Sequence, residues 1–177
     1  MFTEHDEEII FDDNDGVPEP DDGPPYIGFR CRVPLTALLS IADPASSPPW
    51  TRTRASWDIN EIKRRAVEQD YEPGGHLPWL LNQRLWSKQD RGPAHMARVA
   101  WLMNNDHSPE VTIGAAEMIE NQGDWPILDG NHRFAAAILR GDREIDIIIH
   151  GEPGLVEETR FWLEGLVSPE LDPPLFH

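Results

Sequence analysis

Long apolar runs are missing from this chain of 177 residues, and cysteine is nearly absent. No stretch approaches the ~20 consecutive apolar residues that a membrane-spanning helix needs. The first six residues also lack the basic start and the apolar run of a secretory signal, so we expect a cytoplasmic protein with no membrane span. The single cysteine, Cys31, excludes an internal disulfide and a cysteine-rich zinc module.

Positive charge is also scarce. The chain holds 15 basic and 32 acidic residues, for a formal charge of -17, which argues against a general nucleic-acid coat protein. The acidic residues gather at the ends, however, because residues 1–25 hold ten of them and no Lys or Arg, whereas residues 26–151 are nearly balanced at -2. The charge argument against nucleic-acid binding therefore applies mainly to the ends of the chain and only weakly to residues 26–151.

The same imbalance divides the chain into three predicted segments. Residues 1–25 combine ten acidic residues with four prolines, a composition that cannot repay the entropy of ordering, and we predict a mobile acidic leader. This leader is either a solubilising tail or a mimic of a phosphate backbone that covers a basic site. Residues 26–168 are predicted to form one domain, and residues 169–177 an irregular tail.

Apolar periodicity predicts strands that alternate with helices. The expected strands cover residues 26–33, 111–113, 127–128 and 144–150, and the expected helices cover residues 34–39, 59–66, 93–103, 132–140 and 155–166. Asp58 and Glu61 have the spacing of a capping box at the start of the second helix. The last helix is expected to turn one face inward, with Leu155, Thr159, Trp162, Leu163 and Leu166. This order of elements favours an α/β (α+β) domain.

A strand-to-helix turn in the last third of the domain is the most legible feature. A short buried strand at residues 127–128 is expected to lead into a buried helix from His132 to Arg140. Asn131 is predicted to cap the start of this helix, and Gly141 to end it in a left-handed conformation. The isoleucine-rich strand that follows, at residues 144–150, is expected to be buried on both faces.

The five residues from Asp129 to Arg133 (DGNHR) are the candidate chemical site at this turn. The unpaired N–H groups and positive dipole end of the helix attract an anion, and Gly130 lets a phosphate approach the backbone beside Asn131. Arg133 can clamp a phosphate with two hydrogen bonds, and His132 can exchange a proton near neutral pH. Asp129 can bind Mg²⁺ or orient a water. As bare chemistry, local capping of the turn explains the same residues.

Two further sets of residues are weaker candidates. His95 and Arg98 are three residues apart on a predicted helix and can reach the same site as supporting groups, although a partly exposed helix face explains them equally. Five cations within 14 residues form the densest basic patch of the chain: Arg52, Arg54, Lys63, Arg64 and Arg65. This basic patch is either a contact for DNA phosphates or a solvated helix face.

The run from Pro126 to Ala137 (PILDGNHRFAAA), followed by Gly141 and the isoleucine-rich strand, resembles the signature of the ParB/sulfiredoxin superfamily. In that superfamily a Gly-x-[His/Arg]-Arg box begins a helix and binds nucleotide phosphates. The resemblance covers residues 111–150, extends more weakly to residues 95–103, and reaches residues 26–39 only as a general pattern. It implies a mixed sheet flanked by helices in a single domain, and it does not specify the activity.

Two departures narrow what the resemblance implies. Sulfiredoxins have their catalytic cysteine where this chain has Asn131, and Cys31 lies far away in the sequence, so we do not expect sulfinic-acid reduction. Partitioning ParB proteins continue into a helix-turn-helix module, whereas only 27 residues follow His150 here, so we do not expect centromere recognition. The remaining likeness is to short plasmid fertility-inhibition proteins, also called oncogenic-suppression (Osa-like) proteins.

That similarity implies a factor that blocks conjugative or type IV secretion transfer. It implies weak ATPase and DNase activity, in which Asp129 holds Mg²⁺ or water, His132 handles a proton and Arg133 stabilises charge on phosphate. The box from Gly130 to Arg133 would bind the phosphate of ATP, CTP or DNA. The protein would be bacterial and cytoplasmic, in contact with inner-membrane transfer machinery. The alternative is a non-enzymatic inhibitor that binds a component of that machinery, with the acidic ends as its competing surface.

Overall fold

The computed structural model describes residues 7–9, 26–44, 58–72, 91–106, 109–120 and 125–166 of the chain. The expected C-terminal tail at residues 169–177 lies outside these ranges, as do Arg52 and Arg54 of the basic patch and most of the expected leader.

A mixed sheet forms the centre of the described structure, with the strand order β1-β2-β5-β3-β4. The strands are β1 (Glu7–Ile9), β2 (Ile27–Pro34), β3 (Glu110–Gly114), β4 (Ile127–Asp129) and β5 (Glu144–Gly151). The central strand β5 pairs antiparallel with β2 and parallel with β3, while β1 pairs antiparallel with β2 and β4 with β3. The predicted α/β class with a mixed sheet and flanking helices is confirmed.

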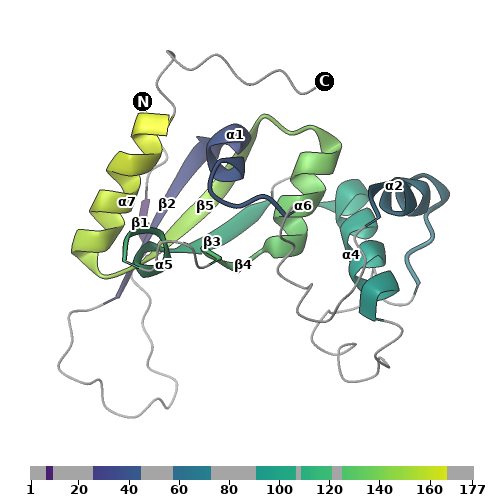
Figure 1. The fold of residues 1–177 in the computed structure, drawn as a ribbon, viewed down its shortest axis with the longest axis horizontal. Helices are drawn as coiled ribbons and strands as arrows, with labels where there is room; N and C mark the ends of the chain where they lie inside the picture. The colour runs from purple at the N-terminus through teal and green to yellow at the C-terminus, as the bar shows by residue number, and fades with distance from the viewer. Residues whose placement is uncertain are drawn as a thin grey trace, which may run out of the picture.

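The described helices fall into two groups. They are α1 (Leu35–Leu39), α2 (Ile59–Glu68), α4 (Arg91–Asn105), α5 (Ala115–Ile119), α6 (Asn131–Arg140) and α7 (Pro153–Leu166). Figure 1 shows α1, α6 and α7 beside the sheet, whereas α2 and α4 lie beyond α6, away from the sheet. We call α2 and α4 the helical pair, and the sheet with α1, α5 and α7 the sheet region. None of the described helices combines the length and apolarity that crossing a membrane requires.

The core of the sheet region lies on one face of the sheet. Cys31 and Val33 of β2 lie opposite Ile147 and Ile145 of β5, and all four are buried. Leu38 of α1, Phe134 of α6 and Leu163 of α7 belong to the same buried cluster, so these three helices cover the same face. Burial of apolar area in this layer is the main stabilising contribution of the sheet region.

The opposite face of the sheet carries ion pairs around a buried isoleucine of the central strand. Arg30 of β2 reaches Glu110 of β3 at 2.7 Å, and Arg32 contacts Asp146 of β5 at 2.6 Å. Ile148 of β5 pairs with Arg30 on this face and is only 8% exposed. The isoleucine-rich strand is therefore buried on both faces, as predicted.

Helix α6 is shared between two cores. Phe134 and Ala137 belong to the cluster of the sheet region, whereas Ala135 and Ala136 belong to a second cluster with the helical pair. The members of the second cluster from α2 and α4 are Ile62, Ala66, Met96, Val99, Ala100 and Leu102. A helix that is apolar nearly all round is expected to be buried, and here it is enclosed by sheet on one side and by α4 on the other.

Two local expectations differ from the structure. Trp162 was expected to face inward from α7, yet it is 42% exposed. The buried stripe of α7 runs through Val156, Thr159 and Leu163, because positions three and four apart share one helix face and Trp162 lies at its edge. In the acidic leader, where no regular structure was expected, residues Glu7–Ile9 pair with β2 as strand β1.

Candidate functional site

The turn between β4 and α6 is built on Gly130. Its φ of 84° lies in the left-handed region, where a residue with a side chain is strained. A Cβ at this position would lie 2.8 Å from the carbonyl oxygen of Glu110 and 2.9 Å from the Cα of Val111, both on β3. The absence of a side chain therefore makes room for β3, which is a structural reason for glycine that the phosphate hypothesis did not include.

Asn131 is the first residue of α6, and the residue at the cap position is Gly130. The prediction that Asn131 caps the helix is therefore wrong. Instead, Asn131 Oδ1 accepts a hydrogen bond from the indole Nε1 of Trp125 at 2.7 Å, and Asn131 Nδ2 donates to the carbonyl oxygen of Ile127 at 3.4 Å. The amide thus braces the turn, and the described structure has no side-chain cap on the backbone N–H groups of the first turn of α6. Trp125 was not among the site residues predicted from the sequence.

Asp129 and Arg133 form an ion pair across the turn. Arg133 Nη2 donates to Asp129 Oδ2 at 2.8 Å, and the Asp129 side chain is 75% exposed. An exposed pair of this kind is worth little in stability, so the guanidinium can exchange Asp129 for another anion at small cost. Among the described residues, no side chain caps the N-terminus of α6, and the end of its dipole lies beside this ion pair.

The fit of a Mg²⁺ ion to Asp129 is poor. Within the described ranges, no group of three or more His, Cys, Asp and Glu side chains is placed to hold a metal ion. The carboxylate of Asp129 accepts a hydrogen bond from a cation instead. Mg²⁺ prefers several oxygen ligands and repels a guanidinium, so this donor set does not match the expected metal site.

His132 of α6 contacts His95 of α4. The Nδ1 atom of His95 lies 2.8 Å from the Nε2 atom of His132, and the two rings are nearly parallel, with an interplanar angle of 14°. A hydrogen bond between two imidazoles requires one nitrogen to donate and the other to accept. The expectation that His95 supports the site is thus matched by a direct contact between the two side chains.

Desolvation sets the charge state of His132. Burial of its ring lowers the pKa of His132 well below the usual value, because the charged form loses water. The neighbouring His95 and the charges of Arg98 and Arg133 lower the pKa further. His132 is therefore neutral at pH 7.

Arg98 lies one helical turn from His95 on α4 and carries a second positive charge to this place. Its guanidinium lies 4.8 Å from the centre of the Trp101 ring, a cation–π contact. Burial and the nearby charge of Arg133 lower the pKa of Arg98, although the group stays protonated at neutral pH. Two guanidinium groups and two imidazoles thus gather beside the first turn of α6.

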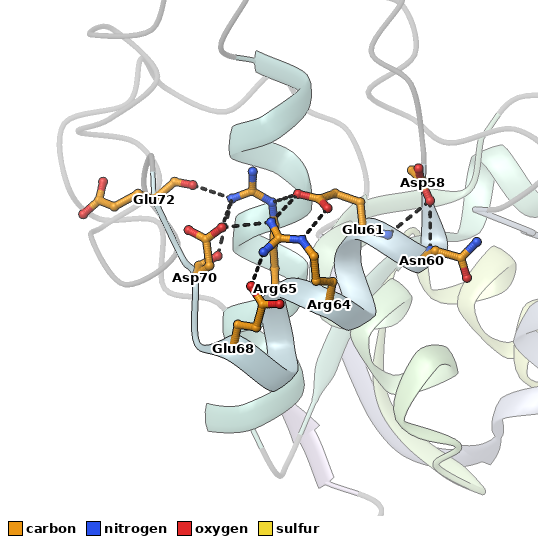
Figure 2. A network of polar contacts seen from close by, with 8 residues as sticks. All are labelled: Asp58, Asn60, Glu61, Arg64, Arg65, Glu68, Asp70 and Glu72. Atoms are coloured by element: carbon orange, nitrogen blue, oxygen red, sulfur yellow. Dashed lines mark hydrogen bonds and ion pairs between the residues drawn. The ribbon is translucent and has the colours of Figure 1, made fainter.

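The described part of the basic patch lies on α2, where two of its arginines belong to a network of ion pairs. Figure 2 shows Arg64 and Arg65 turned toward carboxylates of their own helix and of the following loop. Arg64 contacts Glu61 at 2.7 Å, Asp70 at 3.0 Å and Glu68, while Arg65 donates to Glu61 at 2.7 Å. Hydrogen bonds from Arg64 lower the pKa of Glu61 to about 2.

This network satisfies Arg64 and Arg65 internally and leaves Lys63 as the exposed cation of the described part of the patch. Between residues 58 and 72 there are five acidic and three basic side chains, so the surface is not positive overall. The arrangement favours the solvated helix face over the DNA contact. The signal was present in the sequence, because Glu61 and Glu68 have helical spacing to Arg64. The same helix start confirms Asp58 as its cap, since Asp58 Oδ1 accepts from the N–H groups of Asn60 and Glu61.

Comparison with family models, with curated proteins and with solved structures finds no match for this chain. The likeness to the ParB/sulfiredoxin superfamily therefore depends on the sequence signature alone.

Proposed function

We propose that this protein binds the phosphate of a nucleotide or of DNA at the N-terminus of α6, as the ParB/sulfiredoxin signature implies. One observation carries the proposal: His95 and Arg98 of α4 and His132 and Arg133 of α6 gather at one helix start. The guanidinium groups of Arg98 and Arg133 repel one another, which is the cost of the arrangement without a ligand. A bound anion removes that repulsion.

The proposed binding step is an exchange of anions at Arg133. A phosphate oxygen takes the place of Asp129 at the guanidinium, and the N–H groups of the first turn of α6 bind a second oxygen. Arg98 adds a further charge from the neighbouring helix. The ligands that this chemistry recognises are ATP, CTP and the phosphates of single- or double-stranded DNA.

Hydrolysis of a phosphoanhydride or phosphodiester is the activity that we propose for the bound ligand, giving weak ATPase and DNase turnover. Neutral His132 can accept a proton from the attacking water, and its contact with His95 can share that proton. Arg133 stabilises the charge that develops on phosphate, and Asp129, once released, can orient the water. The poor metal fit means that we assign no step to Mg²⁺. In a bacterial cytoplasm this activity would serve a fertility-inhibition factor that acts against conjugative or type IV secretion transfer.

A non-enzymatic inhibitor of the same machinery is the second candidate. It is favoured by the ion pair of Asp129 with Arg133, because Asp129 already occupies the guanidinium that would hold the phosphate. Such an inhibitor would bind a component of the transfer machine through its acidic surface and would release no product.

Calorimetric titration of the full chain with ATP, CTP and single- and double-stranded oligonucleotides, together with a phosphate-release assay, tests the proposal. Arg133→Ala should weaken binding at least about tenfold, the effect of one lost charged hydrogen bond, and Arg133→Lys should recover part of it. His132→Ala should reduce turnover more than binding. Arg143→Ala, at an exposed arginine after the other end of α6, is the matched control for loss of one charge.

The outcome at Arg133 decides between the two candidates. If Arg133→Ala binds and turns over nucleotide like the parent protein, the N-terminus of α6 is not the site. If the parent binds none of these ligands, the non-enzymatic inhibitor is the better hypothesis.

A further inference from the structure

Arg140, the last residue of α6, crosses to the end of α4. Its Nη1 atom donates to the carbonyl oxygen of Leu102 at 3.1 Å and to that of Asp106. Leu102 lies in the last turn of α4, where its carbonyl oxygen also accepts from the N–H of Asp106 at 2.9 Å, and Asp106 directly follows the helix. A cation at this end also complements the negative end of the helix dipole. Arg140 thus caps a helix other than its own.

Asp142 holds Arg140 in this position. Its carboxylate accepts from Arg140 Nε at 2.9 Å and from Nη2, so Asp142 makes two hydrogen bonds to the guanidinium. Asp142 is itself fixed by the C-terminal turn of α6, in which its N–H donates to the carbonyl oxygen of Ala137 at 3.0 Å. Gly141, with a φ of 81°, makes this turn possible. The hydrogen bonds run without a gap from the end of α6 to the end of α4.

The hydrogen bonds of Arg140 to Asp142 and to the end of α4, which we call the C-terminal clamp, lie at one end of the contact between α4 and α6. The contact of His95 with His132 lies at the other end. Arg140 follows His132 by eight residues on α6, and Leu102 follows His95 by seven residues on α4. At 1.5 Å per residue these intervals are about 12 Å and about 10 Å, so the two helices run side by side in the same direction. The histidines join their N-terminal parts, and the C-terminal clamp joins their C-terminal ends.

Between these two points the fully buried side chains that α6 turns toward α4 are alanines, and Leu139 is partly buried against the same cluster. Ala135 and Ala136 of α6 lie in one cluster with Met96, Val99 and Ala100 of α4. Large side chains that interlock fix both the distance and the axial position of two helices, whereas alanine methyl groups form low ridges that allow close approach and resist sliding weakly. The axial position of α4 therefore depends on the polar contacts at the two ends.

We propose that Arg140 is a positioning residue: by tying the end of α4 to the end of α6 it sets the contact of His95 with His132. The contact itself is a feature of the fold, and only its consequence for phosphate binding depends on the function proposed above. Arg98 is carried by the same helix, so its guanidinium moves with His95 relative to Arg133.

Nitrogen-15 NMR of the histidine rings across pH, on the full chain, tests this positioning directly. In Arg140→Gln the His95–His132 hydrogen bond should be lost, and the titration midpoint of His132 should rise toward the usual value because water reaches the ring. Asp142→Asn should produce a smaller change in the same direction, and Arg140→Lys should restore the parent spectrum only partly, since an ammonium cannot grip two carbonyls and a carboxylate at once.

Asn104→Ala is the matched control for a general loss of packing at the end of α4. Asn104 Nδ2 donates to the carbonyl oxygen of Ala66 at 2.7 Å and to the hydroxyl of Tyr71 at 2.6 Å, so it ties α4 to α2 and not to α6. This variant should lower the melting temperature and leave the histidine spectrum unchanged. Equal histidine changes in Asn104→Ala and Asp142→Asn would overturn the proposal, and so would an unchanged spectrum in a folded Arg140→Gln or Asp142→Asn variant.

Titration with ATP then separates this inference from the proposed function. Arg140→Gln should raise the Kd for ATP about tenfold if the gathered side chains form the phosphate site. If the parent protein binds none of ATP, CTP and DNA, the proposed function fails while the histidine spectra still decide the role of Arg140. If Arg140→Gln changes the spectra and ATP binds as tightly as before, the contact is positioned by Arg140 but does not contribute to binding.

Discussion

The sheet region and the helical pair are held together by different forces. In the first, side chains from four strands and four helices form the buried apolar cluster, with Phe134, Ile147 and Leu163 fully enclosed. In the second, a smaller cluster that includes Ile62 and several alanines is supplemented by directional bonds at its margins. Apolar burial tolerates small shifts, whereas a hydrogen bond fails within an ångström, so the helical pair is the part whose position depends on single residues.

Helix α6 makes the two regions interdependent. Its Phe134 face belongs to the sheet region and its Ala135 face to the helical pair, and the candidate site lies at the start of this same helix. A site made by side chains from both α4 and α6 requires both regions to be folded. Substitutions confined to one region test how far its folding depends on the other region.

Phe134→Ala should have the largest effect. Phe134 is completely buried in the sheet core, and truncation leaves a cavity that costs about 3–5 kcal/mol in the free energy of unfolding. Urea unfolding followed by circular dichroism measures this loss.

Ile62→Ala in the helical pair is the comparison. In this variant the backbone amides of α2 should exchange hydrogen faster, whereas those of β5 should stay protected as in the parent protein. If the β5 amides lose protection equally, the two regions unfold as one unit.

Gly130→Ala should have the next largest effect, a loss of about 2–4 kcal/mol in the free energy of unfolding. The variant combines a left-handed backbone with a collision of the new Cβ against β3. Gly141→Ala is the matched control, since Gly141 has a φ of 81° and nothing within 4 Å of its added Cβ. It should cost about 1–2 kcal/mol, the backbone penalty alone. Thermal and urea unfolding measure both variants, and equal losses would show that the contact with β3 does not limit the residue at position 130.

Lowering the pH should reduce the free energy of unfolding, because His132 lies at the contact between the two regions. The folded state holds the pKa of His132 below that of the unfolded chain, so below about pH 6.5 the unfolded state binds a proton that the folded state does not. Stability should therefore fall as the pH drops through this value, by up to about 1.4 kcal/mol per pH unit for one proton. Urea unfolding of the parent and of His132→Asn between pH 7.5 and 5 (about the range of histidine titration) measures the difference. An equal slope in the two proteins would contradict this origin.

Asp58→Ala should have the smallest effect, about 1 kcal/mol, because it removes the cap of α2 alone. Hydrogen exchange should localise the loss to the first turn of α2. Asp58→Asn keeps a good cap and should be nearly neutral. A change in the exchange of β5 amides would indicate that the helical pair supports the sheet more than its contacts suggest.

Much of the fold could be predicted because it depends on local patterns. Gly141 ends α6, Asp58 caps α2, and the isoleucine run around Ile147 marks a strand buried on both faces, since each signal acts within a few residues. Asn131 shows the limit of such signals, because the cap position and the first helical position differ by only one residue. Gly130 takes the cap position because the close approach of β3, which is distant in sequence, leaves no room for a side chain there. Trp162 was misplaced for a related reason, since a helix face is decided by the surface against which it lies.

The sequence alone determined the α/β class, the turn at Asp129–Arg133 and the types of side chain that gather there. Only the tertiary structure decided which of them meet. It joined His95 to His132 across 37 positions of the chain, and it bound Arg64 to carboxylates so that a basic run is not a basic surface. It also sent Arg140 to the end of another helix. The physical reason is that spacing within one element follows from backbone geometry, whereas contacts between elements depend on how whole buried faces fit together.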